Sequence, residues 1–133
     1  MKYYIDTSAF AKVLIEEEES EGVKKLLDSI EDEGSILISS ALLETEARRV
    51  AYRNNIAQDL VTMLIDKIQV CDVTRVDFRR AGLLVAANGT RDVRSLDAIH
   101  LAVAESQLAD VFITYDAAQA LAALSLGMVL KTK

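Results

Sequence analysis

Four acidic residues occupy positions from which an α/β chain could bring their carboxylates together. Asp6 and Asp116 each follow a short apolar run typical of a buried strand, whereas Glu46 and Asp97 lie in helical stretches. In an open parallel sheet, ligands bind beyond the carboxyl ends of the strands, which Asp6 and Asp116 would both reach. Carboxylates gathered there repel one another unless a hard cation such as Mg²⁺ or Mn²⁺ offsets their charge. The pattern therefore indicates a metal-dependent site for phosphoryl chemistry.

Three of these acids also have a structural interpretation, as helix caps. Asp6 could cap a helix that begins near Ser8, and Asp116 could cap the helix that follows it. Ser95 or Asp97 could cap a third helix in the same way. A functional role for Asp6 is favoured because an ionised group that ends a buried strand is costly without a partner.

Two glutamates on one predicted helix, Glu44 and Glu46, are candidates for the fourth acid of the site. Glu46 shares a helical stripe with Arg49 and Arg53, whereas Glu44 forms an i, i+4 pair with Arg48 on another stripe. Glu46 also stands nearer the apolar face of this helix. We therefore assign Glu46 to the site and Glu44 to solvent.

The other residues whose side chains could take part in catalysis or binding have simpler interpretations. His100 is the only histidine, and we interpret it as a packed, hydrogen-bonded helix residue because it has no partners for base or zinc chemistry. Cys71 is interpreted as a small core residue. The four tyrosines could stack on bases or bury apolar area: Tyr3, Tyr4, Tyr52 and Tyr115.

Composition predicts one folded domain over residues 1–133, since 51% of the residues are apolar and 27% are charged. A single cysteine excludes an internal disulfide and suits a reducing compartment. The longest uncharged stretch, residues 117–130, is too short to span a bilayer, and Asp6 and Lys12 break any signal-peptide pattern. We therefore expect a cytoplasmic protein without a membrane partner.

The net charge of −6 argues at first against a nucleic-acid partner. However, residues 1–35 hold ten acids and four bases, while residues 36–133 hold eleven of each. The acid excess therefore belongs to one segment, which we interpret as a solvated helix surface. The rest of the chain has enough arginines for local basic patches.

Strand and helix signals alternate along the chain. Strands are predicted at residues 2–6, 35–39, 68–73, 111–114 and 128–131. Helices are predicted at residues 8–15, 20–30, 57–67, 97–108 and 117–126, from Ser39 or Ser40 to Arg53, and from Thr74 to about residues 88–89. This alternation predicts an α/β fold with parallel strands, right-handed crossovers and helices on both faces of the sheet.

Four motifs, in this order and spacing, resemble a PIN domain and, more narrowly, the VapC toxins of toxin–antitoxin pairs. The motifs are residues 4–9, residues 39–42 leading to Glu46, residues 94–102 and residues 114–116. The resemblance covers nearly the whole chain. It implies a single PIN-like domain with a parallel five-stranded sheet and the activity of a Mg²⁺- or Mn²⁺-dependent endoribonuclease.

The resemblance also assigns roles to individual residues. The acidic cluster falls on Asp6, Glu46, Asp97 and Asp116, which we expect to hold one or two ions directly or through water. Ser8 matches a hydroxyl position beside the first acid. Arg49 matches a basic position that contacts substrate phosphate or anchors Glu46. The implied partners are RNA, a second copy in a homodimer, and a cognate VapB-type antitoxin that occupies the acidic groove.

Two other functions are compatible with parts of this pattern. An aspartyl-phosphate phosphatase also begins with an aspartate after the first strand, but it needs a second aspartate where this chain has Ser8. A non-catalytic protein-interaction scaffold could keep the same fold. The scaffold predicts neither affinity for divalent ions nor RNA turnover.

Overall fold

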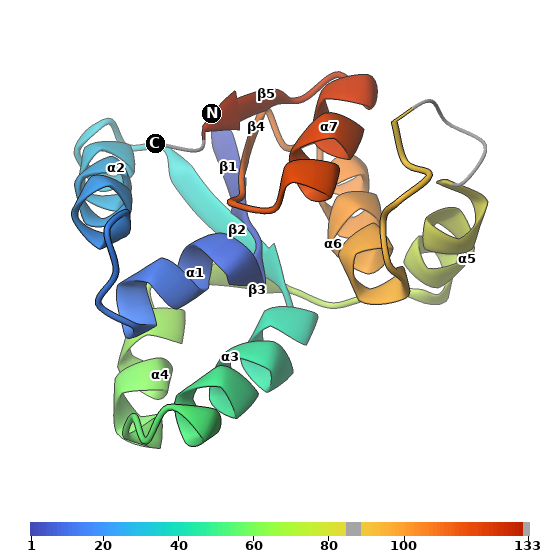
Figure 1. Ribbon diagram of the computed structural model, residues 1–133. Helices are drawn as coiled ribbons and strands as arrows, with labels where there is room; N and C mark the ends of the chain where they lie inside the picture. The colour runs from blue at the N-terminus through green and yellow to red at the C-terminus, as the bar shows by residue number, and fades with distance from the viewer. Residues whose placement is uncertain (85–88, 132–133) are drawn as a thin grey trace.

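The centre of the protein is a five-stranded parallel sheet with the strand order β3-β2-β1-β4-β5 (Figure 1). The structure is a computed structural model that describes residues 1–84 and 89–131. The strands are β1 Lys2–Ile5, β2 Ile36–Ser40, β3 Gln69–Cys71, β4 Val111–Ile113 and β5 Val129–Lys131. All four neighbouring pairs are parallel, which confirms the predicted sheet.

Seven helices connect the strands in the described ranges. They are α1 Thr7–Leu14, α2 Ser20–Asp32, α3 Leu42–Arg53, α4 Gln58–Ile65, α5 Arg75–Leu83, α6 Ser95–Ser106 and α7 Ala117–Ser125. Every predicted helix is present. The predicted end of the fifth helix, near residues 88–89, falls partly on residues 85–88, outside the described residues.

The helices cover both faces of the sheet, as predicted, because the side chains of each strand alternate in direction. Tyr3 and Ile5 of β1 face a core formed with α1 to α4, whereas Tyr4 faces a second core formed with α5 to α7. β4 alternates in the same way, with Phe112 stacked on Tyr4 at a ring distance of 5.2 Å. β1 and β4 are therefore held from both sides, and so are the segments that leave their carboxyl ends.

Helix boundaries follow local chemistry, with one correction. Thr74 caps α5 in a reciprocal capping box with Asp77, as expected for its cap. The predicted cap of α6 is wrong: Arg94 occupies the N-cap position without a side-chain hydrogen bond, so Ser95 and Asp97 lie inside the first turn. The carboxylate of Asp97 is consequently not used on its own helix backbone.

The remaining interpretations of single residues can be compared with their burial. Cys71 is buried with 8% exposure, and Tyr3 and Tyr4 belong to the cores, whereas Tyr52 is 80% exposed. Within residues 1–84 and 89–131, no helix has the length and apolar character needed to cross a bilayer.

Candidate active site

Asp6 is the most enclosed of the four acids, at 2% exposure. It follows β1 directly, and its Oδ1 accepts the backbone N–H of Ala9 at 3.1 Å, so it does cap α1. The same oxygen accepts the Ser8 hydroxyl at 2.7 Å, and Oδ2 accepts the Thr114 hydroxyl. Burial raises the pKa of Asp6 against the opposing effect of these hydrogen bonds. Capping and a site role are therefore compatible for this residue.

Ser8 connects Asp6 to the end of β4. Its hydroxyl donates to Asp6 and accepts the backbone N–H of Tyr115 at 2.9 Å, and it lies 3.1 Å from the Thr114 hydroxyl. The structure thus brings Ser8 beside the first acid, where the resemblance expects a hydroxyl. Its hydroxyl is engaged in holding Asp6, which differs from the role of the second aspartate of a phosphatase.

Glu46 points from α3 toward the end of β1. Its Oε1 accepts the Thr7 hydroxyl at 2.6 Å and lies 2.6 Å from Nε2 of His100. Partial burial alone would raise the pKa of Glu46, but the hydrogen bonds from His100 and Thr7 outweigh it, so the pKa is lowered. Glu44 instead pairs with Nε of Arg48 at 3.1 Å on the exposed side of the helix. The geometry therefore agrees with the choice of Glu46 over Glu44.

His100 is buried, as expected, but it lies against the acidic cluster. Its Nδ1 is 2.6 Å from the Tyr4 hydroxyl, and its side chain is 1% exposed. Because the Glu46 carboxylate only accepts, Nε2 of His100 carries a proton toward Glu46. The sequence interpretation missed this contact. The signal that could have indicated it is the spacing of His100, one turn after Asp97 on one helix face.

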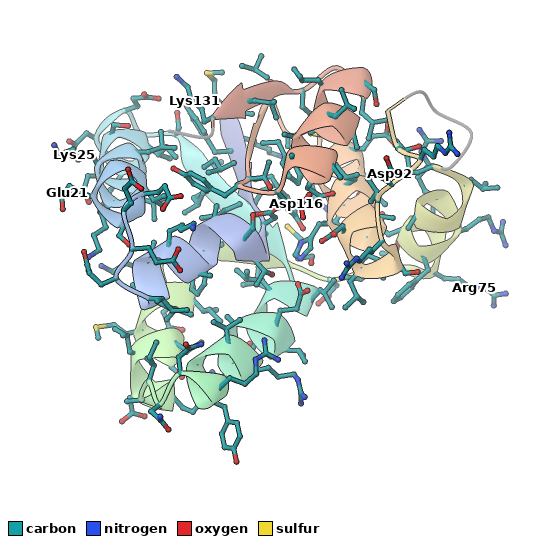
Figure 2. All side chains as sticks on the ribbon, viewed as in Figure 1. Glu21, Lys25, Arg75, Asp92, Asp116 and Lys131 are labelled. Carbon is teal, nitrogen blue, oxygen red and sulfur yellow. The ribbon has the colours of Figure 1, made fainter. Side chains whose placement is uncertain are left out.

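Asp97 and Asp116 complete the acidic cluster from α6 and α7. Both are partly exposed, and Asp116 caps α7 by accepting the backbone N–H of Gln119 at 2.9 Å. The pKa of Asp97 is raised first by burial and then by the negative charges of Asp116, Asp6 and Glu46. Asp97 therefore lies within the electric field of the other three acids (Figure 2, which labels Asp116).

Gln119 joins the two elements that carry these last acids. It is fully buried, and its Nε2 donates to the backbone oxygen of Asp97 at 3.1 Å. Its Oε1 has no hydrogen-bond partner in the part of the chain that the structure describes. Nothing in the sequence pattern pointed to Gln119, because its contacts depend on how α7 packs against α6.

Arg49 is exposed on α3, one turn beyond Glu46. It makes no hydrogen bond or ion pair with any residue of 1–84 or 89–131, so the anchoring of Glu46 that the resemblance allowed is not found. Thr7 and His100 hold Glu46 instead. Contact with substrate phosphate is the role that stays open for Arg49.

The donor chemistry of the cluster fits a hard divalent cation. All four acids supply oxygen, and the pKa of Asp97 is raised first by burial and then by repulsion from the other three acids, which a cation would relieve. No three His, Cys, Asp or Glu side chains of the described residues are arranged to hold an ion together. Direct ligation by all four acids is therefore not found. The arrangement suits an ion that keeps several waters and binds one or two carboxylates, as Mg²⁺ commonly does.

Comparison of the sequence and the fold with known proteins identifies the relatives of this chain. Residues 3–124 match the PIN domain family. Over 117 residues the chain is 32% identical to Ribonuclease VapC47 of Mycobacterium tuberculosis, which covers 85% of this chain and 83% of that protein. The fold is similar to that of VapC20 of Mycobacterium tuberculosis, described as a Sarcin-Ricin loop cleaving toxin. That similarity has a TM-score of 0.74 at 17% identity over 96% of each chain, and it concerns the fold alone.

The matched residues include all four acids and the carboxyl ends of β1 and β4. This chain belongs to the PIN domain family. Within that family, its identity with Ribonuclease VapC47 confirms the predicted resemblance to VapC-type ribonucleases.

Proposed function

We propose that this protein is a divalent-metal-dependent endoribonuclease that acts as the toxin of a VapBC-type toxin–antitoxin pair. The observation that carries the proposal is geometric: Asp6, Asp97 and Asp116 lie at the starts of α1, α6 and α7, and Glu46 reaches Thr7 and His100 at the same edge of the sheet. Coupled carboxylates at the carboxyl ends of parallel strands suit a site that binds cations and phosphate esters. The relationship to Ribonuclease VapC47 supports RNA as the substrate.

The proposed reaction adds water across a phosphodiester P–O bond. A bound Mg²⁺ or Mn²⁺ ion would lower the pKa of the attacking water and offset charge on the phosphate. Asp6, Glu46, Asp97 and Asp116 would hold the ion directly or through water. Ser8 and Thr114 fix both oxygens of Asp6, and Thr7 and His100 fix Glu46, so the two side chains need little reordering when substrate arrives.

The proposal also covers the domain organisation, the cellular location and the protein partners of this nuclease. Residues 1–133 would act as a single nuclease domain in the cytoplasm, where its RNA substrate is made and used. A homodimer is the proposed assembly, and a cognate VapB-type antitoxin is the proposed inhibitor that covers the acidic site. Light scattering tests the homodimer, and co-purification with a candidate VapB-type antitoxin tests the inhibitor.

The proposed activity is tested by mapping cleavage sites on total cellular RNA with and without Mg²⁺, using protein freed of any inhibitor. Glu46→Gln and Asp97→Asn should lose cleavage, while Glu44→Gln, changed two positions away on the exposed side of α3, should retain it. Calorimetric titration with Mn²⁺ should give weaker binding to Asp97→Asn than to the wild type. Equal weak Mn²⁺ binding in both, with no RNA turnover, would favour a non-catalytic scaffold.

A further inference from the structure

The carboxyl-terminal part of α3, one to two turns beyond Glu46, carries a basic and aromatic surface. Arg49 and Arg53 are exposed there, and Tyr52 is 80% exposed. Together with Arg48 and Gln58 they line a shallow hollow of about 290 Å³. This group of arginines contrasts with the net charge of −6 of the whole chain.

The arginines of this hollow are not equivalent. Arg48 is engaged: its Nε pairs with Glu44 at 3.1 Å, and its terminal nitrogens donate to Gln58 Oε1 at 3.1 Å and to the Thr62 hydroxyl at 2.9 Å. Its charge is largely offset, and it joins α3 to α4. In contrast, Arg49 and Arg53 make no hydrogen bond or ion pair with the described residues. Their guanidinium groups keep all five N–H donors for a ligand.

The free arginines continue the stripe of α3 that begins at Glu46. With a rise of 1.5 Å per residue, Arg49 lies about 4.5 Å and Arg53 about 10.5 Å along the helix axis from Glu46. Tyr52 lies one turn beyond Arg49 on the adjoining stripe. A strand whose scissile phosphate reached the acids could therefore follow this helix outward, with cations and an aromatic ring along its path.

We propose that Arg49, Tyr52 and Arg53 form a surface that binds the single-stranded flank of the RNA substrate. The guanidinium groups contact consecutive phosphates, and Tyr52 stacks on an unpaired base. A single strand is favoured because a base must leave its helix to stack on a protein side chain. This inference rests on the proposed RNA substrate, and it assigns to α3 the task of setting which nucleotides lie beside the acids.

Binding of a short, unstructured, fluorescein-labelled RNA tests this surface. The measurement uses the Asp6→Asn background in EDTA, so that cleavage does not interfere. The test variants are Arg49→Gln/Arg53→Gln and Tyr52→Ala. The matched control is Arg75→Gln/Arg79→Gln, which removes the same charge from exposed arginines of α5 that have no partner among the described residues. Arg75 projects from the periphery, well away from Asp116 (Figure 2).

The double variant of α3 should lower the slope of log affinity against log salt by about 1.4, that is about 0.7 for each lost phosphate contact. Tyr52→Ala should weaken binding of the single strand by about 5- to 150-fold with an unchanged salt slope. The same substitution should leave binding of a duplex of that sequence nearly unchanged. The α5 control should bind like the background protein.

Three results would overturn this assignment. Equal affinity and salt slope in the α3 variants and the control would remove the surface while leaving the proposed nuclease intact. Tight binding of an oligo-glutamate peptide in place of RNA, lost in the same variants, would assign the surface to an acidic protein partner. Absence of RNA binding in every variant, the background included, would overturn both this inference and the proposed substrate.

Discussion

Asp6 combines a structural and a chemical task in one carboxylate. Its Oδ1 closes the first turn of α1 and receives Ser8, while Oδ2 receives Thr114 from the neighbouring strand end. A carboxylate can accept about four hydrogen bonds, so these three donors leave acceptor capacity for a ligand. This position destabilises the ionised form of Asp6, because the side chain is only 2% exposed. Burial consequently raises the pKa of Asp6.

Replacing Asp6 by Asn should show separately how its buried charge affects stability and how it affects activity. Because the pKa of Asp6 is raised in the folded chain, the folded state binds its proton more tightly than the unfolded state does. The charged side chain therefore destabilises the fold above its folded pKa, and the penalty is relieved as the pH falls through that pKa. Asp6→Asn should abolish RNA cleavage yet unfold, without metal, at or above the wild-type temperature at neutral pH.

Thermal unfolding of both proteins across a pH series checks this expectation. The advantage of Asp6→Asn should shrink on acidification, and Asp72→Asn, which changes an exposed carboxylate after β3, should show no such trend. An advantage that grows toward low pH, or retained RNA cleavage, would contradict the role assigned to Asp6.

The sequence pattern indicated that these acids share one edge of the sheet, but it did not indicate which residues hold them. Asp6 and Asp116 could be identified because strand ends in a parallel sheet share one edge, and this argument needs only local patterns. The contacts of His100 with Glu46 and Tyr4 join residues 54 and 96 positions apart. Such contacts depend on how α3 and α6 pack over the sheet. The spacing of His100, one turn after Asp97, indicates a shared helix face but does not identify Glu46 or Tyr4 as partners.

Among the elements, α1, α6 and α7 all begin at the acidic cluster. Asp6 caps α1, Asp116 caps α7, and Asp97 lies in the first turn of α6. Helix N-termini carry partial positive charge, which stabilises nearby carboxylates and phosphates. The fold therefore offsets part of the negative charge of the cluster through its backbone alone.

Asp116 allows the capping of α7 to be separated from the charge that the cluster needs. Serine is a comparable N-cap that can accept the Gln119 N–H, so Asp116→Ser should change stability by only a few tenths of a kcal/mol. Asp116→Ala loses the cap and should cost about 0.5–2 kcal/mol. Both variants should lose cleavage and Mn²⁺ affinity. Denaturant unfolding together with RNA cleavage checks this, and full activity in Asp116→Ser would contradict the assignment.

The order of elements was predictable, but their ends were set by neighbours. The strand predicted at residues 68–73 is only Gln69–Cys71, because it pairs with just three residues of β2, Ile38 to Ser40. Likewise α6 begins at Ser95, two residues before the predicted start at Asp97. Hydrophobic pattern indicates that an element exists, whereas hydrogen bonding to a partner decides where it stops.

At the scale of the whole molecule, the negative charge has two parts with different consequences. Much of the excess lies in and around α2, where Lys12 lies 2.6 Å from Glu17 and Lys24 lies 3.4 Å from Glu16. Such exposed pairs contribute little to stability. The four candidate acids are different, because Asp97 lies in the field of the other three and no lysine or arginine of the described residues pairs with any of them. Their repulsion is a cost that the metal-free protein bears.

A divalent ion that binds the folded chain should offset this repulsion and raise the free energy of unfolding. At a Mn²⁺ concentration one hundred times Kd, linkage predicts about 2.7 kcal/mol, or a rise in melting temperature of roughly 10 °C for a chain of this size. Asp97→Asn should show a much smaller rise, because it removes the acid whose pKa is raised by burial and by the charges of the other three acids. Glu44→Gln should respond like the wild type, since Glu44 pairs with Arg48 outside the cluster. Thermal unfolding with and without Mn²⁺ makes the comparison, and an equal shift in all three proteins would mean that the ion binds elsewhere.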